Sequence, residues 1–405
     1  MTQEITRRAL LRRSLALGCS AAASPWLTPV ALASAPWENR LVVIILRGGM
    51  DGLDVVRPVG DAAFAELRGN PDPGPDLDGF FALHPALDPL MPLWNKGELG
   101  FVHAVSTPYR DKRSHFDGQD LLEADTAQLG ARRDGWLNRL LQTVPGIEAE
   151  TAYAIGQGGM PLLAGPAPVA SWSPEADLVM SPQALRLAEL VMHDDPAFRA
   201  AFDQALLLAD SDGDPVAMEG DGDDMMAAMA KDARAGRNRG QAHRRVADFA
   251  AERLRGDTRI AAFSLTGWDT HNAQGRNLSR ALDRLAETIT TLKTGMGDAV
   301  WGKTTVVALT EFGRTARLNG TAGTDHGTGG AMVLAGGALN GGRVWSDWPG
   351  LAEADLYDRR DLMPTRDVRA YAAWAMRASF GLGRDVLEDN VFPGVALGDD
   401  PRLLL

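Results

Sequence analysis

Short apolar runs alternate with longer stretches of helical periodicity along the chain. The runs, at residues 41–46, 98–106, 152–156, 259–267, 304–310 and 331–337, are bounded by glycine or polar residues. Continuous apolar runs of this length are typical of strands buried on both faces. Helices are predicted at residues 85–97, 185–209, 244–256, 277–297 and 366–381. The alternation predicts an α/β fold with a largely parallel sheet and helices on both faces.

Polar and glycine-rich segments mark the ends of these elements. The run LVVIIL (41–46) stops at RGGMDGLD, a turn in which backbone can approach a ligand closely. A further helix is predicted to begin after Ser114, whose hydroxyl can cap it. Residues 69–79 are predicted to be loop, and residues 211–226, rich in Gly and Asp, an exposed acidic loop.

The first 33 residues have the features of an export signal. Arg7 and Arg8 form an arginine pair, a modestly apolar stretch follows, and Ala31-Leu32-Ala33 makes a processing site. We therefore predict a twin-arginine signal peptide over residues 1–33 and one mature domain over residues 34–405. The expected location is periplasmic or secreted.

The amino-acid composition excludes some kinds of binding partner and some kinds of metal or catalytic site. The 405 residues carry a formal net charge of −12 without a dense basic stripe in the mature part, which argues against nucleic acid as a partner. No mature run approaches the roughly 20 apolar residues of a membrane span. Cys19 is the one cysteine and lies in the signal, so disulfides and thiolate chemistry are not expected. Any metal must be held by oxygen and imidazole ligands.

Carboxylates and imidazoles gather at the ends of three predicted strands. Asp269 and His271 follow the run at 259–267, Glu311 follows the run at 304–310, and Asp325 and His326 precede the run at 331–337. Ligands of open α/β sheets bind at strand ends. Such groups, brought together, need a compensating cation or hydrogen-bond network. We predict a divalent metal site there, suited to zinc, manganese or calcium.

Each of these residues also has an ordinary structural interpretation. Asp269 could cap the segment after it, His271 could be a surface residue with satisfied hydrogen bonds, and Asp325 could form a turn in GTDHG. The metal interpretation depends on their occurring jointly at successive strand ends.

The chain resembles a known family in its motifs. LRGGMDGLD, RSHFDGQ, GWDTH, TEFGRT and GTDHG, together with the twin-arginine start, resemble domain-of-unknown-function family 1501 (DUF1501), secreted bacterial proteins grouped with the sulfatase and alkaline phosphatase superfamily. The resemblance covers about residues 38–395. It implies an alkaline phosphatase/sulfatase-like fold, while the family's own activity is largely undefined.

The resemblance also implies roles for particular residues. Ser114 occupies the place of the superfamily's nucleophile, with His115 as a nearby proton carrier or ester ligand. Arg314 would be a clamp for the substrate. The first strand departs from the superfamily pattern: Arg47 stands where a metal-binding Asp is expected, and Asp51 is the nearest acid.

Two further departures leave alternatives open. Arg47 could bind an anionic ester or pair with a nearby carboxylate, and Phe312 stands where the superfamily has a His. The site could therefore hold one metal instead of the superfamily's two, or none. We expect an exported metal-dependent hydrolase of phosphate or sulfate esters acting on a small anionic ester. The alternative is a non-catalytic binding or assembly protein with a degenerate metal site and an exported protein partner.

Overall fold

A central sheet organises the molecule. The computed structural model describes residues 37–110, 113–124, 134–156, 160–174 and 241–405. Within this part the sheet has nine strands in the order β10-β4-β9-β8-β1-β7-β5-β6, with β11 beside β4. The strands are β1 (Arg40–Arg47), β4 (Leu99–Ser106), β5 (Ala152–Ile155), β6 (Ala170–Trp172), β7 (Ile260–Thr266), β8 (Thr304–Leu309), β9 (Gly330–Ala335), β10 (Val344–Trp345) and β11 (Arg366–Asp367).

One strand runs against the others. β1 pairs in parallel with β7 and β8, β5 with β6 and β7, and β4 with β10 and β11. β9 is antiparallel to both of its neighbours, β4 and β8. The prediction of a largely parallel sheet is confirmed.

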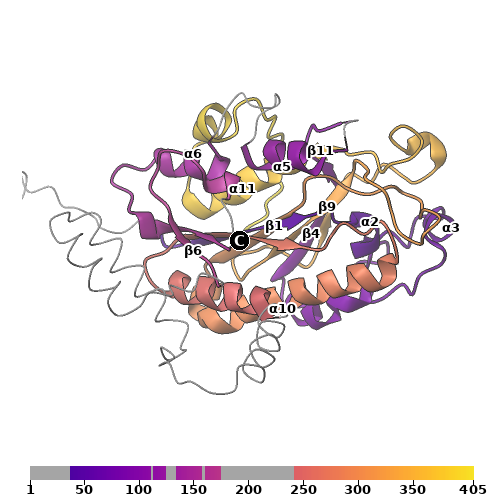
Figure 1. Cartoon of the computed structure of the whole chain (residues 1–405), viewed down its shortest axis with the longest axis horizontal. Helices are drawn as coiled ribbons and strands as arrows, with labels where there is room; N and C mark the ends of the chain where they lie inside the picture. The colour runs from indigo at the N-terminus through magenta and orange to yellow at the C-terminus, as the bar shows by residue number, and fades with distance from the viewer. Residues whose placement is uncertain (1–36, 111–112, 125–133, 157–159, 175–240) are drawn as a thin grey trace, which may run out of the picture.

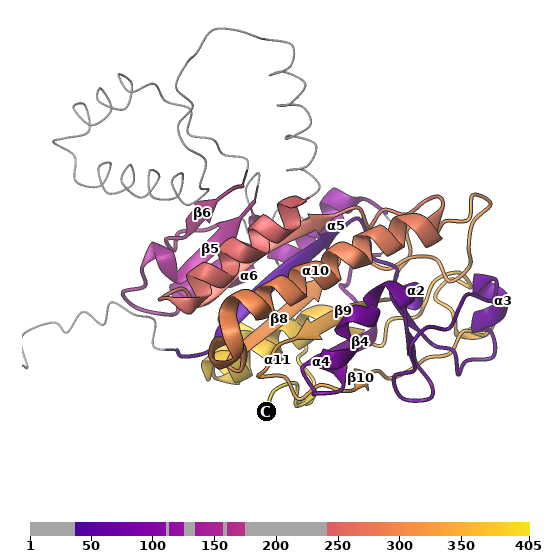
Figure 2. The same ribbon diagram turned by 90° about the horizontal axis from the view of Figure 1, so that it is seen from below.

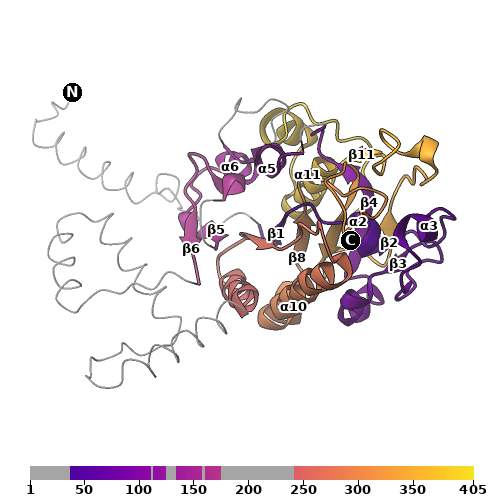
Figure 3. The ribbon, with the colours of Figure 1, turned by 45° about the vertical axis from the view of Figure 1, so that its right-hand side comes forward.

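Both faces of the sheet are covered, which explains the uninterrupted apolar runs. Along β1, Val42 and Ile44 belong to one core cluster while Leu41 and Val43 belong to the other. The first cluster lies under α10 (Gln274–Trp301) and the helical residues 241–255. The second lies under α6 (Trp136–Gln142) and α11 (Val368–Phe380). Figures 1 and 3 show the two helical layers on opposite sides of the sheet, and Figure 2 shows α10 crossing one face.

Short elements connect the strands. They are α2 (Gly52–Val55), β2 (Val56–Arg57), α3 (Phe64–Arg68), β3 (Ala82–Leu83), the 3₁₀ helices η1 (Pro85–Leu90), η2 (Ala149–Thr151), η3 (Pro161–Leu163) and η4 (Glu353–Asp355), α4 (Met91–Trp94), α5 (His115–Ala124) and the π-helix η5 (Val386–Val391). The helix predicted over residues 85–97 is instead η1 followed by α4, since Pro89 and Pro92 lack the N–H that a continuous α-helix needs.

Other predicted elements differ at their ends or lie outside the described residues. The helix predicted over residues 277–297 begins at Gln274 and continues to Trp301 across a kink at Gly297, where φ is +72°. α6 and β6 were not predicted. The signal peptide, the helix at 185–209 and the acidic loop at 211–226 lie outside the described residues. No helix in the described part is long and apolar enough to span a membrane.

The strand directions bring several loops to one edge of the sheet. The carboxyl ends of β1, β4, β7 and β8 and the amino end of the antiparallel β9 all lie at that edge. The segments after β4, β7 and β8 and before β9 carry most of the candidate site residues.

Candidate metal centre

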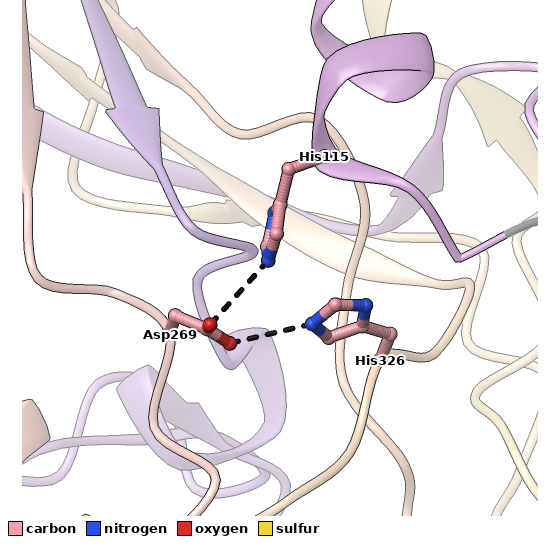
Figure 4. Close-up of side chains that lie close together, drawn as sticks. All are labelled: His115, Asp269 and His326. Carbon is pink, nitrogen blue, oxygen red and sulfur yellow. Dashed lines mark hydrogen bonds and ion pairs between the residues drawn. The ribbon is translucent and has the colours of Figure 1, made fainter.

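Three side chains from separate segments converge at this edge. His115 is the first residue of α5, Asp269 lies in the loop after β7, and His326 precedes β9. Their potential ligand atoms all lie within 4.8 Å of one another, so the three residues form a group that could hold a metal ion. Figure 4 shows both imidazoles directed at the Asp269 carboxylate.

A third imidazole joins this group. His271 Nε2 lies 3.0 Å from Asp269 Oδ1 and 3.0 Å from His326 Nε2. His326 Nε2 is 3.3 Å from Asp269 Oδ1, and His115 Nε2 is 3.5 Å from Asp269 Oδ2. Three Nε2 atoms therefore surround one carboxylate.

The other nitrogen of each ring contacts an acceptor. Nδ1 of His115 is 2.8 Å from Glu311 Oε1, Nδ1 of His271 is 3.2 Å from Asp325 Oδ1, and Nδ1 of His326 is 2.8 Å from the Arg113 carbonyl oxygen. A neutral ring that donates through Nδ1 keeps its lone pair on Nε2. These contacts favour the tautomer that metal-binding histidines need, with an outer acceptor fixing each ring.

His115 has a buried nitrogen that a cation could contact. Its Nε2 atom is buried and has no hydrogen-bond partner among the described residues. A buried polar nitrogen without a partner costs about 1–3 kcal/mol. A cation in the group would satisfy it, so the residues present fit a metal.

The surroundings shift the pKa values of His115 and His326 in opposite directions. The hydrogen bond to Glu311 raises the pKa of His115 above its ordinary value. Burial lowers the pKa of His326, helped by the positive charges of Arg314 and His115. Burial by itself would raise the pKa of Asp269, but its hydrogen bond and ion pair with Arg314 outweigh this and hold it low. An ionised Asp269 and a neutral His326 are both in the form that binds metal.

Glu311 lies behind the imidazoles instead of among the ligand atoms. It is fully buried, and its Oε1 accepts from the Gly48 N–H at 2.9 Å and from Gln119 Nε2 at 3.2 Å besides contacting His115. Burial opposes ionisation, yet the bonds from His115 and the other donors keep the pKa below its ordinary value. Glu311 thus contacts the far nitrogen of a candidate ligand, and its own role as a metal ligand stays a prediction.

Asp325 occupies the equivalent position behind His271. Its Oδ1 accepts from Asn319 Nδ2 at 3.2 Å, and the same amide donates to the His271 carbonyl. Asp325 is thus a partner of a predicted ligand and not a member of the group itself.

Arg314 is a buried residue that hydrogen-bonds to several loops of the site. Its side chain is fully buried and donates to the carbonyl oxygens of Gly48, Gly49, Trp268 and Thr324 and to Asp269 Oδ1. These acceptors belong to the loops after β1 and β7 and before β9. Arg314 therefore ties three site loops together, and its role as a substrate clamp stays a prediction.

Asp51 is held away from the group. Its carboxylate forms a buried ion pair with Arg68, 2.7 Å between Oδ2 and Nη1, and accepts from Gln274 Nε2 at 2.7 Å. Gln274 Oε1 accepts in turn from Thr270 and Thr324 in the site loops. The structure does not support Asp51 as a metal ligand, because these bonds occupy its oxygens.

Arg47 and Ser114 flank the group. Arg47 Nη1 lies 2.8 Å from Glu123 Oε1 in a partly buried ion pair, a partner that the sequence did not indicate. Ser114 precedes α5, and its Oγ accepts from the Asp117 N–H at 3.4 Å, which is the predicted helix cap. Phe312 packs against His115 with ring centroids 5.0 Å apart.

In the described part of the chain, one cavity borders the group and a second borders Asp325 behind it, and their linings include residues that sequence reasoning missed. A small one of about 20 Å³ lies against His326 and includes Arg110, Arg113 and Arg360 in its lining. A larger one of about 660 Å³ shares Arg360 and reaches Asp325. The arginines in RDKR and DRRD were visible in the sequence, but nothing local indicated that they lie beside His326.

We compared the sequence and the structure with known proteins. The family model described as "Protein of unknown function (DUF1501)" matches residues 103–388. No curated protein matches the chain.

The solved structures that resemble this chain share little sequence with it. The lipoteichoic acid synthase LtaP from Listeria monocytogenes has a TM-score of 0.37 and 11% identity, covering 93% of this chain and 76% of that chain. The C-terminal periplasmic domain of EcEptC from Escherichia coli, in complex with Zn, has a TM-score of 0.32 and 10% identity, covering 74% and 73%. The TAB5 alkaline phosphatase mutant with bound Mg has a TM-score of 0.30 and 11% identity, covering 77% and 95%.

Proposed function

Because the chain belongs to the DUF1501 family, whose description assigns no reaction, we propose a function from the site itself: a zinc-dependent hydrolase of phosphate or sulfate esters. The observation that carries this proposal is the set of three imidazoles with oriented Nε2 atoms around the Asp269 carboxylate. Three nitrogen ligands and one oxygen suit zinc better than calcium, which prefers oxygen throughout.

The proposed metal ligands are His115, Asp269, His271 and His326. When bound, zinc would supply Lewis-acid stabilisation of negative charge developing on the ester. The outer acceptors Glu311 and Asp325 would hold two of the rings in place during turnover.

We assign the nucleophile to Ser114. Its place at the N-terminus of the ten-residue helix α5, directly before His115, supports this role. A helix N-terminus favours negative charge on the attacking oxygen. In the proposed reaction, Oγ gives up its proton and bonds to phosphorus or sulfur while the ester P–O or S–O bond breaks, and the alcohol leaves with a proton. Water then bonds to phosphorus or sulfur, the bond to Oγ breaks, the acid is released and a proton from the water returns to Oγ.

The arginines around the small cavity support an anionic substrate, although the cavity itself, at about 20 Å³, has room for only about one water. Arg113 and Arg360 line it next to His326, and Arg360 Nη2 donates to the His326 carbonyl at 3.0 Å. Guanidinium groups match the oxygens of phosphate and sulfate. This pair replaces Arg47 and Arg314 as the proposed anion-binding residues.

The test is zinc-dependent turnover of p-nitrophenyl phosphate and p-nitrophenyl sulfate. We expect the chelated protein to be inactive and to recover with added zinc. Ser114→Ala should lower turnover by at least about 1,000-fold, retain zinc and lose about 1 kcal/mol of stability from the cap. Ser279→Ala, at a partly exposed helical serine, is the matched control and should change none of these three properties.

A second candidate is a non-catalytic metal-binding protein for assembly. The observation in its favour is Arg47, which stands at the end of β1 where the superfamily has a metal-binding Asp and pairs with Glu123. This candidate predicts stoichiometric zinc without turnover of either ester. Turnover that survives Ser114→Ala would instead remove the serine from the mechanism.

A further inference from the structure

The larger cavity lies beside the candidate metal centre and has the dimensions of a small-molecule site. Its volume of about 660 Å³ falls within the range of ligand pockets, roughly 300–1,000 Å³. It shares Asp325 with the outer layer of the centre, because this residue lines the cavity and contacts His271. The Asp269 and His271 side chains are 45% and 43% exposed, so the centre is open to solvent.

The floor of the cavity is aliphatic. Leu67, Leu351 and Leu356, which line it, belong to a small hydrophobic cluster separate from the two cores of the sheet, and Ala316 joins them. The lining residues, all in the described part of the chain, include no aromatic side chain. A sugar or nucleobase would therefore find no ring to stack on.

The charged residues of the lining are already paired. Arg317 lies 3.4 Å from Glu66, Arg359 lies 3.4 Å from Glu353, and Arg360 lies 2.9 Å from Asp361. The remaining lining carboxylate, Asp325, contacts His271. Apart from Arg360, which the proposed function assigns to the anionic head of the ester, the charged residues of the lining offer no unpaired group to a second ionic group, and the leucine side chains are what remains to select a ligand.

We propose that this cavity binds the organic group of the ester and that this group is a neutral aliphatic chain or ring. The inference rests on the proposed function, since the ester head must be held at the metal centre. It adds a specificity site: Leu67, Leu351 and Leu356 would select amphiphilic esters over short or sugar-linked ones.

The test compares two non-hydrolysable probes, methylphosphonate and n-octylphosphonate, by calorimetry on the zinc-loaded protein. Burial of each methylene contributes about 0.8 kcal/mol, or about 4-fold in affinity. We expect n-octylphosphonate to bind at least about 100-fold more tightly than methylphosphonate.

Two substitutions test whether the octyl group of the probe lies in the cavity. Ala352 is an exposed lining residue, whereas Ala354, two residues further along, is exposed and is not in the lining. Ala352→Trp should weaken n-octylphosphonate binding about 10-fold and leave methylphosphonate unchanged, while Ala354→Trp should change neither.

The outcomes separate this inference from the proposed function. Equal affinity for the two probes, or an octyl preference that survives Ala352→Trp, would overturn the cavity assignment while ester turnover could still stand. Failure of both probes to bind the zinc-loaded protein would overturn the cavity assignment together with the metal centre.

Discussion

The three histidines of the candidate centre differ in what holds each ring. His115 contacts a buried carboxylate, His271 an exposed one, and His326 a backbone carbonyl. A carboxylate partner makes an imidazole a stronger ligand, and a buried carboxylate interacts more strongly than an exposed one. We therefore expect the Glu311–His115 pair to contribute most to metal affinity.

Removing the charge of Glu311 tests this expectation. Glu311→Gln should weaken zinc affinity about 10-fold to 100-fold, because the amide holds the His115 ring less firmly and lowers its basicity. Competition with a chromophoric chelator measures the affinity. Glu66→Gln, at an exposed carboxylate, is the control and should leave affinity unchanged. Equal zinc affinity in Glu311→Gln and the parent protein would show that Glu311 has only a packing role.

The sequence predicted the location of these residues better than their roles. Asp269, His271 and His326 lie together because strand ends meet at one edge, a relation that apolar runs reveal. Glu311 follows its strand in the same way, but its side chain turns back toward the Gly48 N–H, which depends on packing between β1 and β8. The pairing of Asp51 with Arg68 likewise joins residues whose side-chain directions no local pattern specifies.

At the scale of elements, β4 carries a buried histidine, His103, with a structural role. His103 Nε2 donates to the backbone carbonyls of Gly52 and Val56, and its Nδ1 accepts from the Ala104 N–H at 2.8 Å. Ala104 has a φ of +56° at the irregularity where the pairing with β9 shifts. Protonation of Nδ1 would remove an acceptor that supports this bulge.

The titration of His103 predicts how stability depends on pH. Burial lowers its pKa from 6.5 to about 4 in the folded protein. Since the unfolded chain protonates first, stability is complete above pH 6.5 and falls as the pH decreases toward 4. At pH 5 the loss is about 2 kcal/mol from this residue. Urea unfolding of His103→Gln should show a smaller loss between pH 7 and pH 5 than the parent protein; equal losses would contradict the assignment.

The elements differ in how much the sequence reveals of them. β1, β4, β7, β8 and β9 follow from their apolar runs, since a strand covered on both faces needs apolar residues throughout. The short strands β10 and β11 have two residues each and carry no periodicity to detect. α6 buries the polar side chains of Asn138 and Arg139 among its apolar residues. These two side chains donate to backbone carbonyls far along the chain, and the sequence of α6 does not reveal those hydrogen bonds.

At the scale of the whole molecule, the twin-arginine export of the chain is a prediction that can be tested directly. Changing both Arg7 and Arg8 to Lys should leave precursor in the cytoplasm, because the twin-arginine route depends on the pair. Fractionation with mass spectrometry of the N-terminus measures this, and the exported parent protein should begin at Ser34. An unprocessed, membrane-anchored chain from cells making the parent protein would contradict the prediction.

The metal centre is the claim on which the proposed function and the cavity assignment both depend, and anomalous diffraction at the zinc edge tests it most directly. Crystals of the zinc-reconstituted protein should give an anomalous peak about 2.0–2.2 Å from the Nε2 atoms of His115, His271 and His326 and from one oxygen of Asp269. Absence of a peak at this position, or a peak there that His115 does not contact, would contradict the account.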